Sequence, residues 1–194
     1  ICKDDAHTRR TERRRIVAGV PTTDNYDSSI DLLAYSAFAQ ASKEWWGSRL
    51  KFSLGLSVLG NTYNAAMRNP LSQISPRASL TYALDEKTDV SANVGRYAKL
   101  PSYTSLGYKN AAGSYANRNT LKYIMANHWV VGVSHRPTDG LSLVVEAFYK
   151  NYENYPISLL EGVSLASKGA EFTALGDEAV ASSGLGRAYG AEAV

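Results

Sequence analysis

Residues that build catalytic and metal sites are scarce in this chain, and their arrangement suggests neither kind of site. The one cysteine, Cys2, cannot form an internal disulfide, so cysteine usage leaves the redox compartment open. The histidines His7, His128 and His135 lack metal-ligand spacing. No nucleophile–base pair and no phosphate-binding loop is recognisable. We therefore expect no enzyme, no metal site and no cofactor.

Long apolar runs are also missing, which excludes a membrane-spanning helix, since such a helix needs about 20 apolar residues. Residues 1–15 are polar and basic, without the apolar region of a secretory signal peptide. Residues 190–194 have the composition of a strand in mid-course. We expect the sequence to be a fragment, cut at both ends. Membrane-spanning strands stay possible, because alternating residues give only a weak hydropathy signal.

Alternation of apolar and polar residues is the dominant pattern. Between residues 75 and 97, two alternating limbs are joined by the polar turn 85–87, which predicts an antiparallel β-hairpin. Residues 30–42 are rich in apolar side chains but alternate poorly, so a helix stays open as an alternative to a strand there. The period of two recurs in three further segments: 50–58, 121–135 and 141–150.

Residues 1–29 are polar and carry a basic run. We interpret this segment as a solvated strand end or loop, because runs of charge usually lie in water. A binding patch for nucleic acid or anionic lipid is the weaker alternative. The modest net charge of +3 gives no reason to expect nucleic acid as a partner. The run consists of Arg9, Arg10, Arg13, Arg14 and Arg15.

The connections between the expected strands alternate between short and long. The short ones span 43–49, 85–87 and 136–140, and the long ones span 60–74, 100–120 and 154–186. In an up-and-down antiparallel array every second connection lies at the same end, so short turns and long loops lie at opposite ends. This asymmetry, with strands of about 10–15 residues, is typical of outer-membrane barrels. The predicted fold is all-β: an antiparallel up-and-down transmembrane β-barrel fragment of about seven strands. A soluble β-sandwich would alternate equally well without the asymmetry.

Specific strings add to this pattern. They are Asn-Pro-Leu-Ser-Gln-Ile-Ser-Pro-Arg at 69–77, Gly-Arg-Tyr at 95–97, Leu-Pro-Ser-Tyr at 100–103, Phe-Tyr-Lys-Asn-Tyr-Glu-Asn-Tyr-Pro at 148–156 and Gly-Arg-Ala-Tyr-Gly-Ala-Glu at 186–192. Together they resemble the C-terminal part of the β-barrel of TonB-dependent outer-membrane receptors. The resemblance covers about residues 30–194, and residues 1–29 would then be a strand end or extracellular loop of the same barrel.

The resemblance implies a receptor in the outer membrane of a Gram-negative bacterium, in contact with the lipid bilayer. Residues 30–194 would form part of a barrel of about 22 strands around a plug domain. Such a receptor binds a scarce extracellular ligand (a siderophore, a cofactor or a glycan) and imports it into the periplasm with energy passed on by TonB. The plug domain and the TonB-contacting segment are not among these residues. A passive outer-membrane pore or structural barrel is the alternative, with a soluble carbohydrate-binding β-sandwich behind it.

Strand parity assigns an apolar face to lipid and a polar face to the barrel lumen. We expect Leu50, Phe52, Leu54, Leu56, Val58, Leu80, Tyr82, Val90, Val94, Val131, Val133, Leu143 and Val145 to face lipid. We expect Lys51, Ser53, Ser79, Asn93, Ser134 and Glu146 to face the lumen. Two aromatic groups suit interfacial girdles, although the tyrosines could instead contact ligand: Trp45 with Trp46, and Tyr149 with Tyr152 and Tyr155.

Ligand contacts are expected in the long loops, because loops on a rigid scaffold commonly carry binding. Loop 101–120 combines tyrosines, which offer flat contact area, with asparagine and arginine donors. This mixture suits a polar ligand with flat surfaces. The candidates are Tyr103, Tyr108, Asn110, Tyr115, Asn117 and Arg118. Loop 153–186 is the alternative location.

Overall fold

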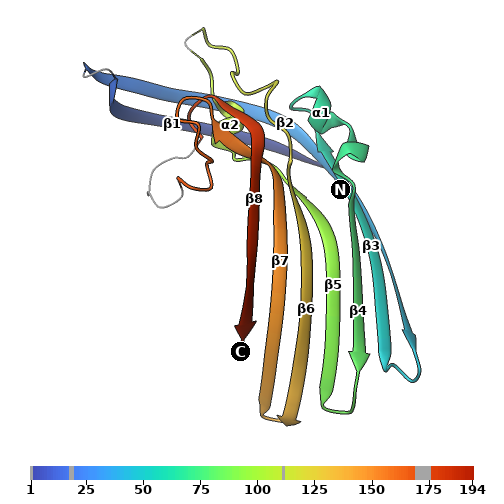
Figure 1. The fold of residues 1–194 in the computed structure, drawn as a ribbon. Coiled ribbons are helices and arrows are strands. Elements are labelled where there is room, and N and C mark those ends of the chain that lie inside the picture. Colours follow the sequence, from blue (N-terminus) through green and yellow to red (C-terminus); the bar gives the residue numbers. More distant parts are fainter. Residues whose placement is uncertain (1, 18–19, 111, 169–175) are drawn as a thin grey trace.

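The computed structural model describes residues 2–17, 20–110, 112–168 and 176–194, with side chains from Ser29 onwards. This part of the chain forms a single antiparallel sheet in which each strand pairs with the next along the sequence (Figure 1). The strands are β1 (Cys2–Val17), β2 (Val20–Trp45), β3 (Leu50–Asn61), β4 (Ser75–Ala83), β5 (Thr88–Lys99), β6 (Ile124–Thr138), β7 (Leu141–Ser158) and β8 (Val180–Ala193). The predicted all-β, up-and-down antiparallel fold is confirmed.

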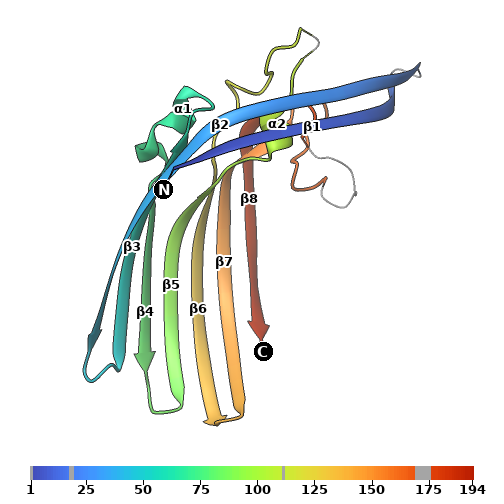
Figure 2. The same cartoon turned by 180° about the vertical axis from the view of Figure 1, so that it is seen from behind.

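The described residues form eight strands, where the sequence predicts about seven. The additional strand is β1, which pairs with β2 from Cys2↔Tyr35 to Val17↔Val20. This hairpin projects beyond the other strands at the loop-bearing end of the sheet (Figure 2). A hairpin needs no apolar alternation where both of its faces lie in water, so its polar sequence reads as a loop. The side chains of the basic run, Arg9 to Arg15, lie outside the described side chains.

Residues 30–42, for which a helix was the alternative, lie within β2. The short helices lie in loops: α1 (Ala65–Arg68), η1 (Pro70–Gln73) and α2 (Tyr103–Gly107). None of the described helices is long and apolar enough to cross a membrane.

The strand register confirms that the predicted apolar residues share one face. Residues paired across an antiparallel sheet point to the same side. One row across the apolar face reads Leu54, Ala78, Val94, Trp129, Tyr149 and Tyr189. On the opposite, polar face, one row reads Ser53, Ser79 and Asn93, and another reads Lys51, Thr81, Ser91, Gly132 and Glu146. A single register thus sorts the side chains of all these strands into two chemically different surfaces.

The apolar face forms an exposed band rather than half of a protein core. Leu54 is 51% exposed and Val131 is 55% exposed, with no described element packed over them. On β7 the band runs from Leu141 to Tyr149, which corresponds to about 27 Å of strand. This height is close to the apolar band of about 25 Å that outer-membrane barrels present to lipid.

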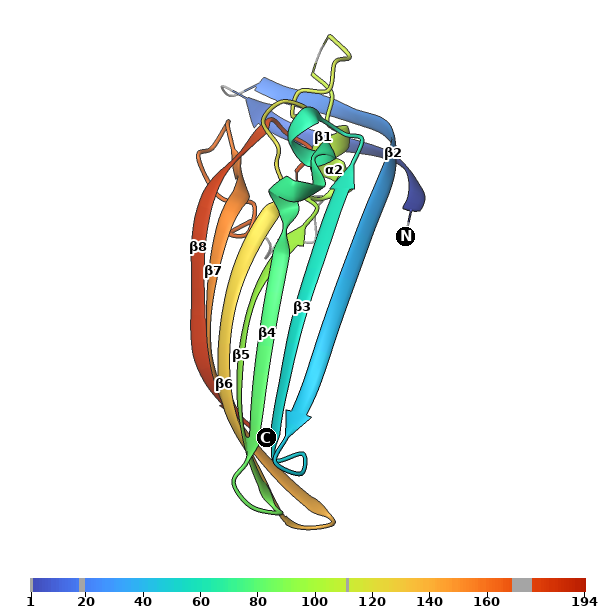
Figure 3. The ribbon, with the colours of Figure 1, turned by 90° about the vertical axis from the view of Figure 1, so that its right-hand side faces the viewer.

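The connections differ at the two ends of the sheet as predicted. The short turns 46–49, 84–87 and 139–140 lie at one end, and the loops 62–74, 100–123 and 159–179 lie at the other (Figures 1 and 3). The last loop is shorter than the predicted 154–186, because β7 and β8 pair up to Ser158↔Val180.

Buried apolar side chains gather at the loop-bearing end. The cluster joins residues from β2, β6 and β8 with residues from the three long loops: Ile30, Leu32, Tyr63, Met67, Leu106, Leu121, Tyr123, Met125, Leu165 and Val180. We call this cluster the loop core. The described parts of the long loops therefore form a packed layer at one end of the sheet.

Candidate ligand-binding end of the sheet

The first long loop is fixed to the sheet and to the second loop by two asparagines. Asn61, fully buried at the end of β3, donates from Nδ2 to the Tyr123 hydroxyl (2.9 Å) and accepts the Tyr63 amide at Oδ1 (2.9 Å). Asn64 caps α1 by accepting the Met67 amide (2.8 Å) and donates to the carbonyl oxygens of Arg118 and Leu121. Burial raises the pKa of Tyr123 to about 12, although the hydrogen bond from Asn61 lowers it.

Asn117, a predicted ligand contact, lies instead at the centre of the packed loops. Its Nδ2 donates to the carbonyl oxygens of Ser105 (2.8 Å) and Glu178 (2.9 Å), and its Oδ1 accepts the Val180 amide (2.8 Å). The residue is fully buried, and these bonds use both N–H donors and one lone pair of the oxygen of its amide. In this structure the Asn117 side chain is buried among the loops, and its role as a ligand contact stays a prediction. A short polar side chain in a loop gives no sequence signal that distinguishes the two roles.

The third long loop is held by a partly buried ionic network. Lys168 lies 2.6 Å from a carboxylate oxygen of Glu178 and 2.9 Å from one of Glu161. Burial lowers the pKa of Lys168, but its hydrogen bonds to both carboxylates outweigh that effect and raise the pKa overall. Ser158 at the end of β7 donates to the other Glu178 oxygen. Glu178 thus ties the third loop to the sheet edge, and its backbone carbonyl joins the Asn117 network.

The tip of the second long loop carries the exposed candidates. Asn110 is exposed, and its Oδ1 accepts the backbone amides of Ala112 and Ser114, both at 3.0 Å. Arg118 is exposed, and its Nε donates to the Tyr63 carbonyl (3.0 Å). Both stay candidates for ligand contact, although both also shape the loop.

The three candidate tyrosines are half-buried. Tyr115 donates its hydroxyl to the Ser29 carbonyl of β2 (2.8 Å), and its ring has Lys109 and Arg118 within cation–π distance, at 5.2 and 5.9 Å. Tyr103 lies in α2 and packs against the loop core. The carbonyl oxygen of Tyr108 accepts the Ala116 amide (3.0 Å). These rings position the loop at least as much as they present a surface to a ligand.

A cationic and aromatic group on the polar face was not predicted. The register aligns Arg77, Gly95, His128 and Lys150 across four strands. Tyr97 lies over this row, with Arg77 4.5 Å from its ring and the His128 ring 4.7 Å away. We call Arg77, Tyr97, His128 and Lys150 the cationic row. Its members are far apart in sequence, so only knowledge of the pairing could have revealed it.

A furrow of about 270 Å³ adjoins this row on the polar face, lined in part by Phe38, Arg77, Asn93 and Tyr97. The charge on this face changes toward the short turns. There Glu44, Glu146 and Glu192 lie on the face with Lys51, which approaches Glu44 at 3.8 Å. The half of the polar face nearest the loops is thus positive, and the half nearest the turns is predominantly acidic.

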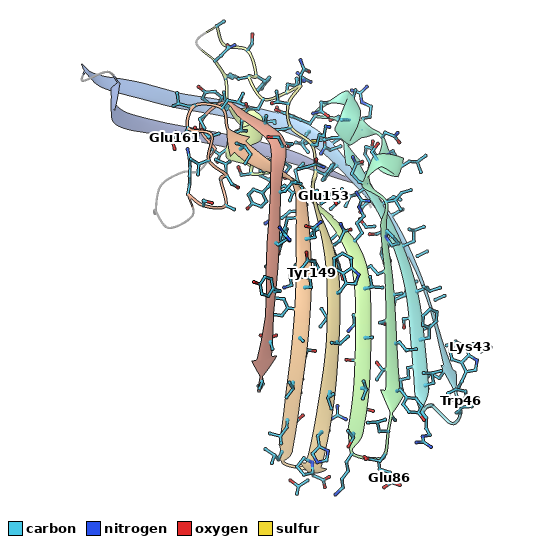
Figure 4. All side chains as sticks on the ribbon, in the orientation of Figure 1. Lys43, Trp46, Glu86, Tyr149, Glu153 and Glu161 are labelled. Carbon is cyan, nitrogen blue, oxygen red and sulfur yellow. The ribbon has the colours of Figure 1, made fainter. Side chains whose placement is uncertain are left out.

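The predicted aromatic groups divide between the two faces. Tyr149 lies on the apolar face, 5.6 Å from the Trp129 ring, whereas Tyr152 lies on the polar face, 6.3 Å from His128. Tyr155 packs against the loop core. At the short-turn end, Trp46 is the first residue of the first turn (Figure 4). Of the three tyrosines, only Tyr149 has the position that an interfacial girdle requires.

Comparison with known proteins agrees with this architecture. The family model described as "TonB dependent receptor-like, beta-barrel" matches residues 5–194, nearly the whole chain. The chain belongs to this family. Its members are transport receptors of the outer membrane of Gram-negative bacteria rather than enzymes. A search of curated proteins found no match. In the described residues, no group of potential ligands could hold a metal ion.

A solved structure shows the same fold. The crystal structure of the siderophore receptor PirA from Pseudomonas aeruginosa matches with a TM-score of 0.61 at 13% sequence identity. The match covers 99% of this chain and 39% of the PirA chain. The chain therefore spans 39% of the length of that receptor.

Proposed function

We propose that this chain is part of an outer-membrane receptor that binds an extracellular ligand and imports it into the periplasm. The main support is the difference between the two ends of the sheet. One end carries a packed layer of long loops, and the other carries only short turns. The lumen-facing wall below the loops is the polar face with its cationic row. Energy from TonB and closure by a plug domain would come through parts of the protein outside these residues.

The cationic row favours an anionic ligand. In the described residues, Arg77 and Lys150 have no carboxylate partner, and Lys150 lies 4.7 Å from the Phe148 ring. Arginine and lysine beside aromatic rings suit a ligand that is both negatively charged and flat. Siderophores of the catecholate class have this chemistry when they hold iron. A ferric catecholate is therefore our first choice among the possible ligands, before a neutral cofactor or glycan.

The test uses the full-length receptor in a Gram-negative host without other siderophore receptors. We expect uptake of radiolabelled ferric catecholate that stops when the proton gradient of the inner membrane is dissipated. Uptake that survives this treatment would indicate a passive pore. Uptake of a neutral ferric hydroxamate or a neutral oligosaccharide, without ferric catecholate uptake, would contradict the anionic ligand but not the receptor.

Variants then locate the contacts. Arg77→Gln should lower ligand affinity about 10-fold, because a hydrogen bond to a charged group contributes about 1.5–3 kcal/mol. Arg118→Gln and Asn110→Ala test the loop tip in the same assay. Lys122→Gln is the matched control, since Lys122 is an exposed cation at the same end outside the cationic row. Surface labelling must show equal amounts of each variant, so that loss of binding is separated from loss of assembly.

A further inference from the structure

The apolar face carries a furrow that the ligand-binding role does not use. It has a volume of about 680 Å³ and lies over the half of β4 nearest the long loops. It forms because Ala78 on β4 is short, while Leu54 on β3 and Trp129 on β6 stand higher to either side of it. Its walls are almost entirely apolar, and the residues that line it come from β2 to β6. A furrow of this kind suits an extended alkyl chain rather than a polar ligand.

Polar donors close the loop-side end of this furrow. Arg96 and Asn127 are part of its lining, and the register continues from them to Asn151 and Arg187 on the same face. This row lies two residues, about 7 Å, beyond the row of Trp129, Tyr149 and Tyr189. Tryptophan and tyrosine rings mark the headgroup level of a bilayer. The donors therefore lie where lipid headgroups begin.

A carboxylate accompanies these donors and has to be included in the charge balance. Glu153 lies 3.8 Å from a guanidinium nitrogen of Arg96 and accepts the Asn127 side-chain amide at 3.2 Å. Figure 4 shows Glu153 on the loop side of Tyr149. Arg96 and Arg187 together exceed this single charge, and both are exposed. At its long distance, the Glu153 contact leaves the guanidinium of Arg96 able to bind a second anion.

We infer that the furrow binds one anionic membrane lipid, with an acyl chain over Ala78 and the phosphate at Arg96 and Asn127. The inference rests on the proposed placement in the membrane, which turns the apolar face toward lipid. Charge complementarity selects the occupant, because an apolar trough that ends in cationic donors matches an acyl chain that ends in phosphate. The bound lipid would fix the depth at which the loop-side edge of the apolar band lies in the membrane.

The experiment measures lipid binding to the delipidated full-length receptor by native mass spectrometry. Phosphatidylglycerol, which is anionic, should bind about 10-fold more tightly than zwitterionic phosphatidylcholine. Arg96→Gln should remove most of this preference. Ala78→Leu should weaken binding of both lipids several-fold by filling the furrow. Lys122→Gln, outside the furrow, and Ala92→Leu, on the same face but outside the furrow lining, should leave both affinities unchanged.

Three results would overturn the inference. The first is equal affinity of both lipids for the wild-type receptor. The second is displacement of phosphatidylglycerol by inorganic phosphate, which would reassign the site to a free anion. The third is a co-purifying protein that Ala78→Leu releases, which would make the furrow a protein interface. A receptor that reaches the outer membrane and imports its ligand without lipid preference refutes only this inference, whereas failure to reach the membrane refutes the proposed function as well.

Discussion

Leucines in the two halves of this molecule have opposite surroundings. Leu106 in the second long loop is completely buried in the loop core, whereas Leu54 in the middle of β3 is 51% exposed. The loop end buries its apolar residues against protein, as a small water-soluble domain does. The strand half presents them outward in a band. The difference shows that the two halves are adapted to two solvents: water around the loops and hydrocarbon around the strands.

The largest loss of stability is expected when these two leucines are truncated to alanine and the two losses are compared. Leu106→Ala should destabilise the loop core by about 2–5 kcal/mol, because it leaves a cavity among fixed neighbours. Leu54→Ala should cost about 1–2 kcal/mol, since lipid can fill the space and only the transfer term is lost. Hydrogen exchange of the loop amides, together with thermal unfolding of the full-length receptor, measures the two effects. Equal costs would remove the distinction between a protein core and a lipid-facing band.

A charge placed on one face or the other tests which face of the sheet lies against lipid. Leu54→Arg should cost about 2–4 kcal/mol of barrel stability near the middle of the bilayer, whereas Ser53→Arg on the polar face should cost little. The readout is the amount of heat-modifiable receptor in the outer membrane. Ser53 and Leu54 are neighbours on one strand, so they are matched in position along β3. Similar losses of heat-modifiable receptor for both variants would contradict the assignment of the faces.

The smallest effect concerns only the loop core and depends on pH. The pKa of Tyr123 is raised from 10.0 to about 12 in the folded loops. Below pH 10 the phenol is protonated whether the loops are packed or open. Between about pH 10 and 12 only the open state ionises, so rising pH should weaken the packing, by an amount on the order of 2 kcal/mol.

Protease sensitivity of the long loops measured against pH checks this expectation. Tyr123→Phe should lower stability below pH 10, because Asn61 loses its partner, and should abolish this part of the pH dependence. A wild-type receptor whose loops are equally protected at pH 9 and pH 12 would contradict the role of Tyr123.

The strand half was largely predictable from the sequence. Side chains alternate between the two faces of a strand with a period of two. The two faces of residues Leu50 to Val58 can therefore be assigned from these residues alone, without knowing which strands pair with them. Connection lengths are equally local, and they predicted the asymmetry between the ends. β1 was missed because its sequence is polar and shows no alternation of apolar and polar residues. The helix alternative for residues 30–42 arose from the same weakness of a purely local pattern.

The loop half, the cationic row and the apolar furrow depended on tertiary structure. Asn117 has the same side chain as Asn110, yet only the packing of three loops makes one a buried crosslink and leaves the other at an exposed tip. The cationic row joins Arg77, His128 and Lys150 through register, and the apolar furrow exists only because strand pairing sets the short Ala78 side chain beside larger ones. The sequence by itself determined which residues alternate and where the chain turns, because those properties are local. Which distant residues meet was decided by strand pairing and loop packing, which bring together positions that no periodicity connects.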